Sequence, residues 1–476
     1  MTDRPEPPAR SGQSSDAGWS REREMTELES TMWRANKHPA NSTQGGVLQV
    51  LSGTPEFDQL RAWHVHGMKK FPRFREKVVT PALPVGPPVW VEDPGFDIDY
   101  HLRRATVSGK GTMRDLLNLC QTIAVTPLDA SRPPWQGTFI EGLEGGRSAY
   151  YLVVNHCLMD GFGSVQLLSG LHTAAKLPSE ADLGDEPELL DETDAVPTPL
   201  QVATGQVKDR LLNAPRALGK AAQTVADAVK AGPKQNAEFL ASMARVMKPA
   251  PVSGSPLFST GSREKWRYGT VDVPLADMKA AGKAVGGTVN DVYVAGVLGG
   301  LRKYHEKRDL EMGDITINMP VSMRREGDSA GGNKFAAAFI QAPGSVADPA
   351  ERMRGIRAMA IKAGSEPALD IFSLVLPVLN RGPAAMLTPL FTSMQNRTDL
   401  TISNVPGATR RGAFVGHDVE AIYYFGPLPG SPVMAVLHSH LGTCHLGLNV
   451  DGEVFDIDDV VACVTEGLDE VLALGR

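Results

Sequence analysis

Residues 150–163 read Tyr-Tyr-Leu-Val-Val-Asn-His-Cys-Leu-Met-Asp-Gly-Phe-Gly. The first five are an unbroken hydrophobic run, typical of a strand buried on both faces of a sheet, and the closing Gly-Phe-Gly prevents the strand from continuing. Such a strand places a single imidazole, His156, at its end. We expect a helix to begin at Ser164, so that rigid elements on both sides hold His156, as a general base requires.

His156 suits proton transfer, because a neutral imidazole with a pKa near ~6.5 accepts a proton from a hydroxyl close to neutral pH. Asp160, four residues further on, would set the geometry of His156 directly or lock the loop through an ion pair. A purely structural interpretation is also open. In that case Asp160 is the N-cap of the helix and His156 is a core histidine. The short spacing does not decide between these interpretations.

His156-x-x-x-Asp160-Gly161 after a buried strand resembles the motif of the acyl-CoA-dependent acyltransferases related to chloramphenicol acetyltransferase and peptide-synthetase condensation domains. Further segments, in the same order as in the family, narrow the resemblance to the bacterial wax ester synthase/acyl-CoA:diacylglycerol acyltransferases. These segments are Phe71-Pro-Arg-Phe-Arg75, residues 88–101, Pro127-Leu-Asp-Ala-Ser-Arg-Pro-Pro-Trp135, Asn290-Asp291, residues 318–324, Gly332-Asn333 and Ser403-Asn-Val-Pro-Gly407. The resemblance covers roughly Glu27 to the C-terminus.

One departure concerns the motif itself: the family's usual pair of histidines is here Asn155-His156. The second histidine is the one that the family uses as base. The resemblance therefore implies that the chemistry survives in this chain.

The resemblance also implies a fold and supporting residues. It predicts an α/β (α+β) protein of two chloramphenicol-acetyltransferase-like domains, each a mixed β-sheet with helices, joined by a helical crossover that leaves a tunnel between them. His156 would be the general base, with Asp160 in an orienting role. The candidate supporting residues are Asn155, Gly161, Arg73 or Arg75 as ion-pair partner of Asp160, Asn290 and Asp291 near the tunnel, and Ser403 or Asn404 at the oxyanion. For Asp291, a carboxylate at a helix N-terminus is the simpler interpretation.

The chain of 476 residues is long enough for two cores, since single cores stop growing near ~250–300 residues. We predict a disordered tail at 1–23, a first acyltransferase domain with the histidine motif at 24–177, a linker with a basic helical crossover at 178–256, and a second domain at 257–476. Residues 200–248 carry eight cations against three anions. This segment either packs as an ordinary crossover or lies on an anionic lipid surface; the two are compatible.

Composition indicates the cellular compartment and restricts the possible partners. The formal net charge is −7, which argues against nucleic acid as a partner. Four scattered cysteines without C-x-x-C spacing fit a reducing cytoplasm. No apolar run approaches the ~18–20 residues that span a bilayer. We therefore expect a cytoplasmic protein, soluble or peripheral at the inner membrane or at lipid droplets.

Two other patterns offer competing sites. Gly327-Asp-Ser329-Ala-Gly331 matches the G-x-S-x-G elbow of serine hydrolases, but a loop precedes it and a predicted strand follows, whereas the elbow needs a strand, a sharp turn and a helix. His438, His440 and His445, with Cys444, invite a metal interpretation. No carboxylate or second cysteine stands at typical spacing, so packing in a hairpin or lining the tunnel is the alternative.

The sequence thus predicts an O-acyltransferase that moves a long-chain fatty acyl group from acyl-CoA to a lipid alcohol. The acceptor would be diacylglycerol, giving triacylglycerol, a long-chain alcohol, giving wax ester, or both. We expect no metal or redox cofactor, acyl-CoA being a substrate. The alternatives are a serine esterase that uses Ser329 and a non-catalytic protein that binds lipid surfaces.

Overall fold

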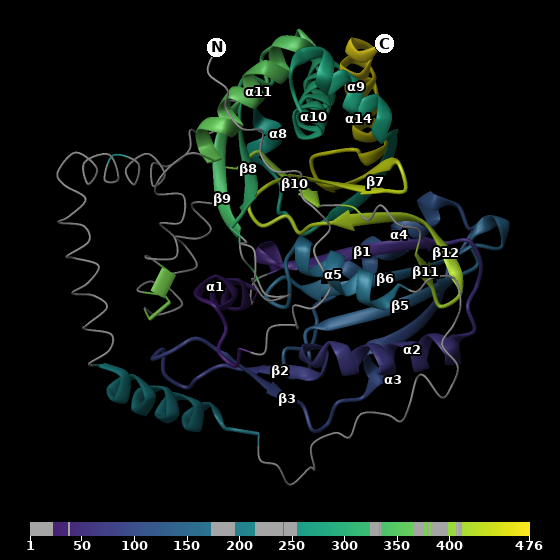
Figure 1. Ribbon diagram of the computed structural model, residues 1–476. Coiled ribbons are helices and arrows are strands. Elements are labelled where there is room, and N and C mark those ends of the chain that lie inside the picture. Colours follow the sequence, from purple (N-terminus) through teal and green to yellow (C-terminus); the bar gives the residue numbers. More distant parts are fainter. Residues whose placement is uncertain are drawn as a thin grey trace, which may run out of the picture.

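A computed structural model describes residues 22–36, 39–172, 196–214, 241, 255–323, 333, 335–364, 376–377, 380–381, 398–405, 407 and 412–476. Within them lie two six-stranded mixed sheets and a two-stranded ribbon. Figure 1 shows the sheets one above the other, the first below and the second above. The fold class predicted from the sequence is confirmed.

The first sheet has the strand order β11-β12-β1-β6-β5-β4. Its strands are β1 (Gln44–Leu51), β4 (Leu102–Thr106), β5 (Trp135–Glu141), β6 (Ser148–Asn155), β11 (Ala413–Phe414) and β12 (His417–Phe425). β4 and β5 are parallel, and the other neighbours are antiparallel. β6 lies inside this sheet with every residue buried, as its apolar run predicted.

Helices and a ribbon complete the first half. They are α1 (Glu27–Ala35), α2 (Phe57–Lys70), α3 (Ile98–His101), α4 (Met113–Val125), α5 (Gly161–Leu171), the ribbon β2 (Glu76–Val79) and β3 (Val89–Glu92), and the 3-10 turns η1 (Pro39–Asn41), η2 (Pro72–Arg75) and η3 (Glu144–Gly146). Trp135 is a core residue: it is buried, and its Nε1 donates to the carbonyl of Phe74 at 2.7 Å.

The second sheet has the order β7-β14-β13-β10-β8-β9. Its strands are β7 (Trp266–Pro274), β8 (Ile315–Ser322), β9 (Phe335–Ala342), β10 (Leu400–Val405), β13 (Val433–His440) and β14 (Thr443–Asp451). The helices of this half are α8 (Pro256–Ser259), α9 (Leu275–Val285), α10 (Val289–Glu306), α11 (Pro349–Gly364) and α14 (Ile457–Leu472), followed by the 3-10 turn η4 (Ala473–Gly475). In Figure 1, α9, α10, α11 and α14 lie on the side of this sheet away from the first half.

Strand pairing does not follow chain order. β11 and β12 belong to the later part of the chain, yet β12 pairs with β1 of the first sheet, with Val47 opposite Tyr424. Without β12, the edge of β1 would expose a row of unpaired backbone groups. The first sheet therefore contains strands from both of the predicted domains, 24–177 and 257–476.

The two halves pack through buried aromatic residues. The Tyr151 hydroxyl of β6 lies 3.2 Å from the Tyr268 hydroxyl of β7, and the Tyr268 ring stacks on Phe425 with centroids 4.0 Å apart. From α4, Arg114 donates to the carbonyl of Tyr268 at 2.6 Å. These contacts join β7 to the first sheet.

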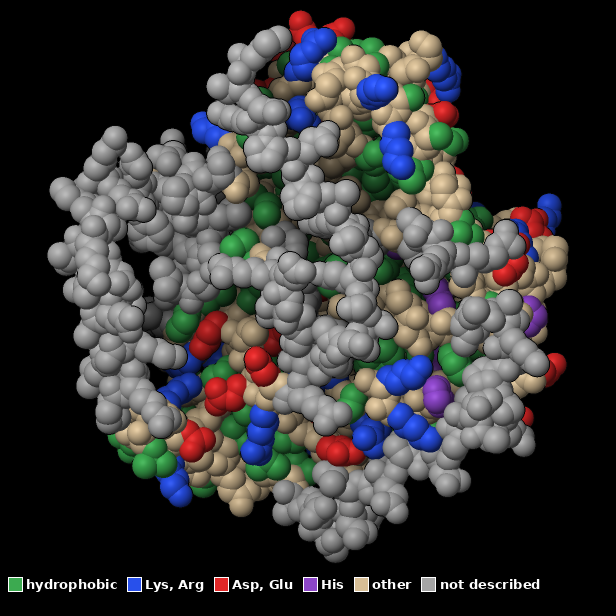
Figure 2. All heavy atoms as spheres, in the orientation of Figure 1, with side chains coloured by type: hydrophobic (Ala, Val, Ile, Leu, Met, Phe, Trp, Pro, Cys, Tyr) green, Lys and Arg blue, Asp and Glu red, His purple; other side chains and the backbone are tan. Residues whose placement is uncertain are grey.

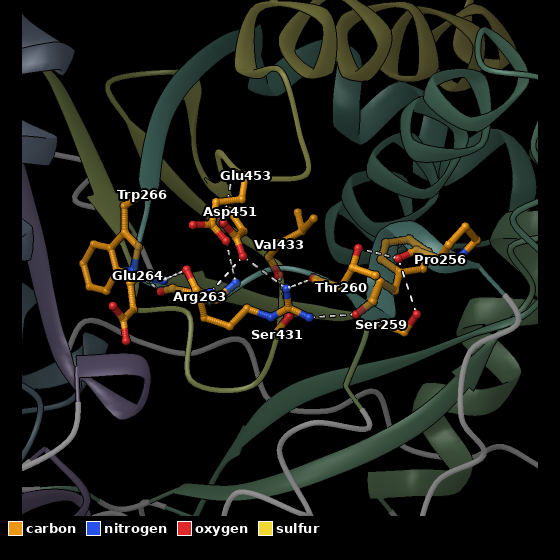
Figure 3. A network of polar contacts seen from close by, with 12 residues as sticks. Pro256, Ser259, Thr260, Arg263, Glu264, Trp266, Ser431, Val433, Asp451 and Glu453 are labelled. Atoms are coloured by element: carbon orange, nitrogen blue, oxygen red, sulfur yellow. Dashed lines mark hydrogen bonds and ion pairs between the residues drawn. The ribbon is translucent and has the colours of Figure 1, made fainter.

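Arg263 binds Asp451 where the chain enters the second half (Figure 3). Its backbone nitrogen donates to the Oδ2 of Asp451 at 2.8 Å, and its Nη1 lies 3.2 Å from the same oxygen. Its Nη2 donates to the carbonyl of Phe258 at 2.8 Å. Because Asp451 is fully buried, this pair satisfies a carboxylate that has no access to water.

The helix after the histidine motif begins earlier than predicted. We expected it from Ser164, but α5 begins at Gly161 and includes Gly163. Glycine costs roughly 1 kcal/mol relative to alanine inside a helix. Here the side chain of Asp160 caps the first turn and offsets that cost.

Within the predicted crossover, the described residues include a helix over 199–214. One face of it is docked, because Gln206 donates to Glu24 at 2.9 Å and to the carbonyl of Pro87 at 2.8 Å. Leu200, Leu211 and Leu212 are exposed. Most of the crossover, and residues 1–21 of the predicted tail, lie outside the described residues.

Figure 2 shows acidic and basic side chains interspersed over the described part of one face. Among the described residues, no helix is both long and apolar enough to cross a membrane.

Candidate active site

His156 follows β6 directly, as the sequence predicted, and is partly exposed. Its backbone N–H donates to the carbonyl of Thr43 at 2.8 Å. Its backbone carbonyl accepts a hydrogen bond from the Nδ2 of Asn333 at 2.8 Å, and its ring Nδ1 lies 3.0 Å from the Oδ1 of Asn333. Asn333 therefore positions both the backbone and the ring of His156.

Asn333 links His156 to a buried carboxylate. Oε1 of Glu29, on α1, accepts from the backbone N–H of Asn333 at 3.0 Å and from its Nδ2 at 3.4 Å. The other oxygen, Oε2, accepts from the backbone N–H of Thr26 at 2.9 Å. Burial raises the pKa of Glu29, while the donors of Thr26 and Asn333 and the nearby Arg73 oppose the rise.

Neither Glu29 nor Asn333 was among the predicted site residues. Gly332-Asn333 contributes to the family resemblance, which implies no role for the amide of Asn333. Thr26 and Glu29 form a capping box, a signal that the sequence carries, but that pattern predicts a helix start and no contact with a site.

Asp160 is the N-cap of α5, the structural interpretation left open above. Its Oδ1 accepts from the backbone N–H of Gly163 at 2.8 Å. Gly161 lets this helix start lie close to the second half: a Cβ added there would stand 2.9 Å from the Cγ2 of Val405 on β10. The motif therefore also joins the two halves.

Asn155 builds the turn that carries His156. It is buried, and its Oδ1 accepts from the backbone N–H of Cys157 at 3.0 Å and from the hydroxyl of Thr43 at 3.3 Å. The residue that replaces the family's first histidine thus hydrogen-bonds within the turn.

Arg73 and Arg75 each contact a carboxylate other than Asp160. Arg73 lies 2.8 Å from Glu76, and Arg75 lies 3.1 Å from Glu92. Arg73 also lowers the pKa of Glu29 electrostatically. Arg73 therefore influences Glu29 through its charge. The expected ion pair with Asp160 remains a prediction.

The structure brings together two of the predicted residues of the second half: Nδ2 of Asn404, the last but one residue of β10, donates to Oδ1 of Asn290 at 3.4 Å. Ser403 precedes Asn404 on β10. Asp291 instead accepts from the Thr288 backbone at 2.8 Å and pairs with Arg357 at 3.2 Å. This is the helix-terminus role given above as the simpler interpretation.

The histidines near the C-terminus pack within a hairpin. His438 on β13 stands opposite His445 on β14, and Nδ1 of His445 lies 2.8 Å from Asp272. Burial, with neighbouring His440 and His445, lowers the pKa of His438 to about 3. No group of three ligands that would hold a metal ion is found in the described part of the chain. Ser329, the competing nucleophile, lies outside that part.

An apolar hollow lies on the first half, between α2, α5 and the β5–β6 hairpin. Its lining includes Met68, Phe71, Leu152, Leu167 and Leu171. Leu152 belongs to β6, the strand that ends just before His156.

Comparison with known proteins decides the family. Residues 25–293 match the wax ester synthase/diacylglycerol acyltransferase catalytic domain, and residues 331–471 match the C-terminal domain of the same family. The chain belongs to this family. It is an acyltransferase, and the resemblance seen in its motifs is confirmed.

Relatives of this acyltransferase include two proteins of Mycobacterium tuberculosis, from strains CDC 1551 / Oshkosh and ATCC 25618 / H37Rv, provisionally named diacylglycerol O-acyltransferases. Each is 34% identical over 458 residues, which cover 95% of this chain and 92% of the relative.

Among solved structures, the wax ester synthase/diacylglycerol acyltransferase of Marinobacter aquaeolei VT8 has a TM-score of 0.62 at 20% identity and covers 95% of this chain and all of its own. The first condensation domain of the calcium-dependent antibiotic synthetase has a TM-score of 0.59 at 16% identity, covering 96% and 97%. These likenesses show the fold.

Proposed function

We propose that this acyltransferase moves a long-chain fatty acyl group from acyl-CoA to the hydroxyl of diacylglycerol, of a long-chain alcohol, or of both, with His156 as general base. The observation that carries the proposal is the placement of His156. His156 follows a fully buried strand. Asn333 hydrogen-bonds to its backbone carbonyl and to its ring Nδ1.

The proposed reaction has two steps. His156 takes the proton of the acceptor hydroxyl while that oxygen attacks the thioester carbonyl, which forms an oxyanion. The intermediate collapses, the carbon–sulfur bond breaks, and the CoA thiolate recovers the proton from the imidazolium. A thiol with a pKa near ~8.5 is a good leaving group, so one base suffices.

Donors for the oxyanion are proposed from β10. Asn404 and its neighbour Ser403 are the candidates, since β10 reaches the motif through Val405 and Gly161.

The test is a competition between acceptors. Purified protein would receive palmitoyl-CoA with equal amounts of diacylglycerol and hexadecanol, and triacylglycerol, wax ester and free CoA would be measured. We expect CoA release that requires an acceptor. Release of CoA and free palmitate without any acceptor, lost in Ser329→Ala, would favour the serine esterase instead. Binding of acyl-CoA without any turnover would favour the lipid-binding alternative.

A further inference from the structure

Asn333 has only one orientation that satisfies its neighbours. Its Nδ2 faces two acceptors, the carbonyl of His156 at 2.8 Å and the carboxylate of Glu29 at 3.4 Å. A flipped amide would direct an oxygen at both of them. The amide oxygen must therefore face the imidazole of His156.

An amide oxygen only accepts hydrogen bonds, so the ring nitrogen beside it must carry a proton. Nδ1 of His156 lies 3.0 Å from that oxygen. We propose that Asn333, held by Glu29, is a positioning residue that keeps the proton of neutral His156 on Nδ1 and so leaves Nε2 as the proton acceptor. Its consequence for catalysis rests on the proposed function.

The carboxylate behind the amide makes the arrangement stable. Glu29 fixes the backbone and the side chain of Asn333 through one oxygen and is itself fixed by Thr26 through the other. When His156 takes up a proton during the reaction, its Nδ1–H bond to the amide oxygen becomes charge-assisted and strengthens. The series Glu29, Asn333 and His156 therefore favours the imidazolium that forms in the transition state.

This order of groups resembles a catalytic triad in logic: a base oriented by a second group that is itself oriented by a third. The third group comes from α1, near the start of the chain, and the second from residue 333 just before β9. Both halves of the molecule are therefore needed to set the tautomer.

The experiment is NMR of protein labelled with ¹⁵N-histidine, read together with steady-state kinetics. His156→Gln identifies the signals of His156 by their loss. In the wild type we expect a protonated Nδ1 and an unprotonated Nε2. In Asn333→Ala we expect the proton to move to Nε2 in part or wholly. We also expect kcat to fall by at most the ~10²–10⁴-fold that a general base contributes, with KM for acyl-CoA nearly unchanged.

Two further variants separate positioning from packing. Asn333→Asp keeps an acceptor beside Nδ1, so the Nδ1–H signal should persist even though the side-chain donor to Glu29 and to the carbonyl of His156 is lost. In Glu29→Gln, the amide NH₂ group must face a donor, either that of Thr26 or those of Asn333. The position of Asn333 is then less well fixed, and we expect a mixture of the two His156 tautomers. Glu27→Gln is the matched control: Glu27 lies on the same helix but pairs with Arg381, and this change should leave both signals and kcat as in the wild type.

The inference is overturned if wild-type His156 carries its proton on Nε2. It is also overturned if Asn333→Ala lowers kcat while the Nδ1–H signal stays. The spectrum needs no turnover. If His156→Ala were as active as the wild type, the proposed base would be wrong, and the tautomer would still be measured independently.

Discussion

Gly161, the first residue of α5, lies against Val405, the last residue of β10, so closely that a Cβ at position 161 would stand 2.9 Å from Cγ2 of Val405. The histidine motif of the first half and the strand that follows Asp399 in the second half thus meet at this glycine. Real Cβ contacts essentially never come that close, so the side chain of Val405 or one of the two elements would have to shift.

Gly161→Ala should push the start of α5 away from β10. We expect a loss of about 1–3 kcal/mol in the free energy of unfolding, typical of overpacking, and several-fold lower kcat. Val405→Ala in the same chain should recover most of both. Urea unfolding and CoA release measure these effects; a double variant no better than Gly161→Ala would contradict the contact.

Asp160→Asn and Asp160→Ala distinguish a helix cap from a required charge. Asparagine caps as well as aspartate, whereas alanine costs about 1 kcal/mol. We therefore expect Asp160→Asn to keep the melting temperature and most of kcat, and Asp160→Ala to lose more of both. Equal damage in the two variants would instead indicate that the carboxylate charge matters, as in the ion pair expected with Arg73 or Arg75.

The sequence predicted these local elements well and their long-range contacts poorly. The run from Tyr150 to Val154 predicted β6 and placed His156 directly after it. Hydrophobic periodicity reports which residues are buried and gives no information on the pairing partner. The pairing of β12 with β1, across more than half of the chain, could therefore not be derived from it.

The same reason explains why Glu29 and Asn333 were not predicted as site residues. Glu29 carries a clear local signal as a helix cap, and this signal accounts for its presence without reference to the site. Only the fold brings Glu29 to Asn333 and Asn333 to His156. The start of α5 was missed because Gly161 and Gly163 argue locally against a helix, while the cap and the packing on Val405 favour one.

Arg263→Met should destabilise the second half, because it leaves the buried carboxylate of Asp451 without its cation. We expect a loss of about 3–5 kcal/mol in the free energy of unfolding, measured by urea denaturation. Adding Asp451→Asn should recover part of it. Arg302→Met, which breaks a pair with the half-exposed Glu306 on the same helix, should cost only about 0.3–0.5 kcal/mol. Equal costs for the two arginines would contradict this account.

The buried histidines should make stability fall in mild acid. Burial lowers the pKa of His438 to about 3 from an ordinary 6.5, so the unfolded chain binds the extra proton between these values. The stabilisation is present above pH 6.5 and is lost as the pH falls toward 3. Between pH 7 and pH 5 the loss from this one group is about 2 kcal/mol. Urea midpoints of the wild type and His438→Leu should diverge over that range, and parallel curves would be the contrary result.

The central claim is that His156 is the base, and the rate of CoA-thiol release from palmitoyl-CoA in the presence of diacylglycerol tests it most directly. Wild type, His156→Ala and Ser329→Ala would be compared after checking that all three have the same melting temperature. A general base contributes about 10²–10⁴-fold, so we predict a fall of that size in His156→Ala and none in Ser329→Ala. A His156→Ala variant as active as the wild type would contradict the account.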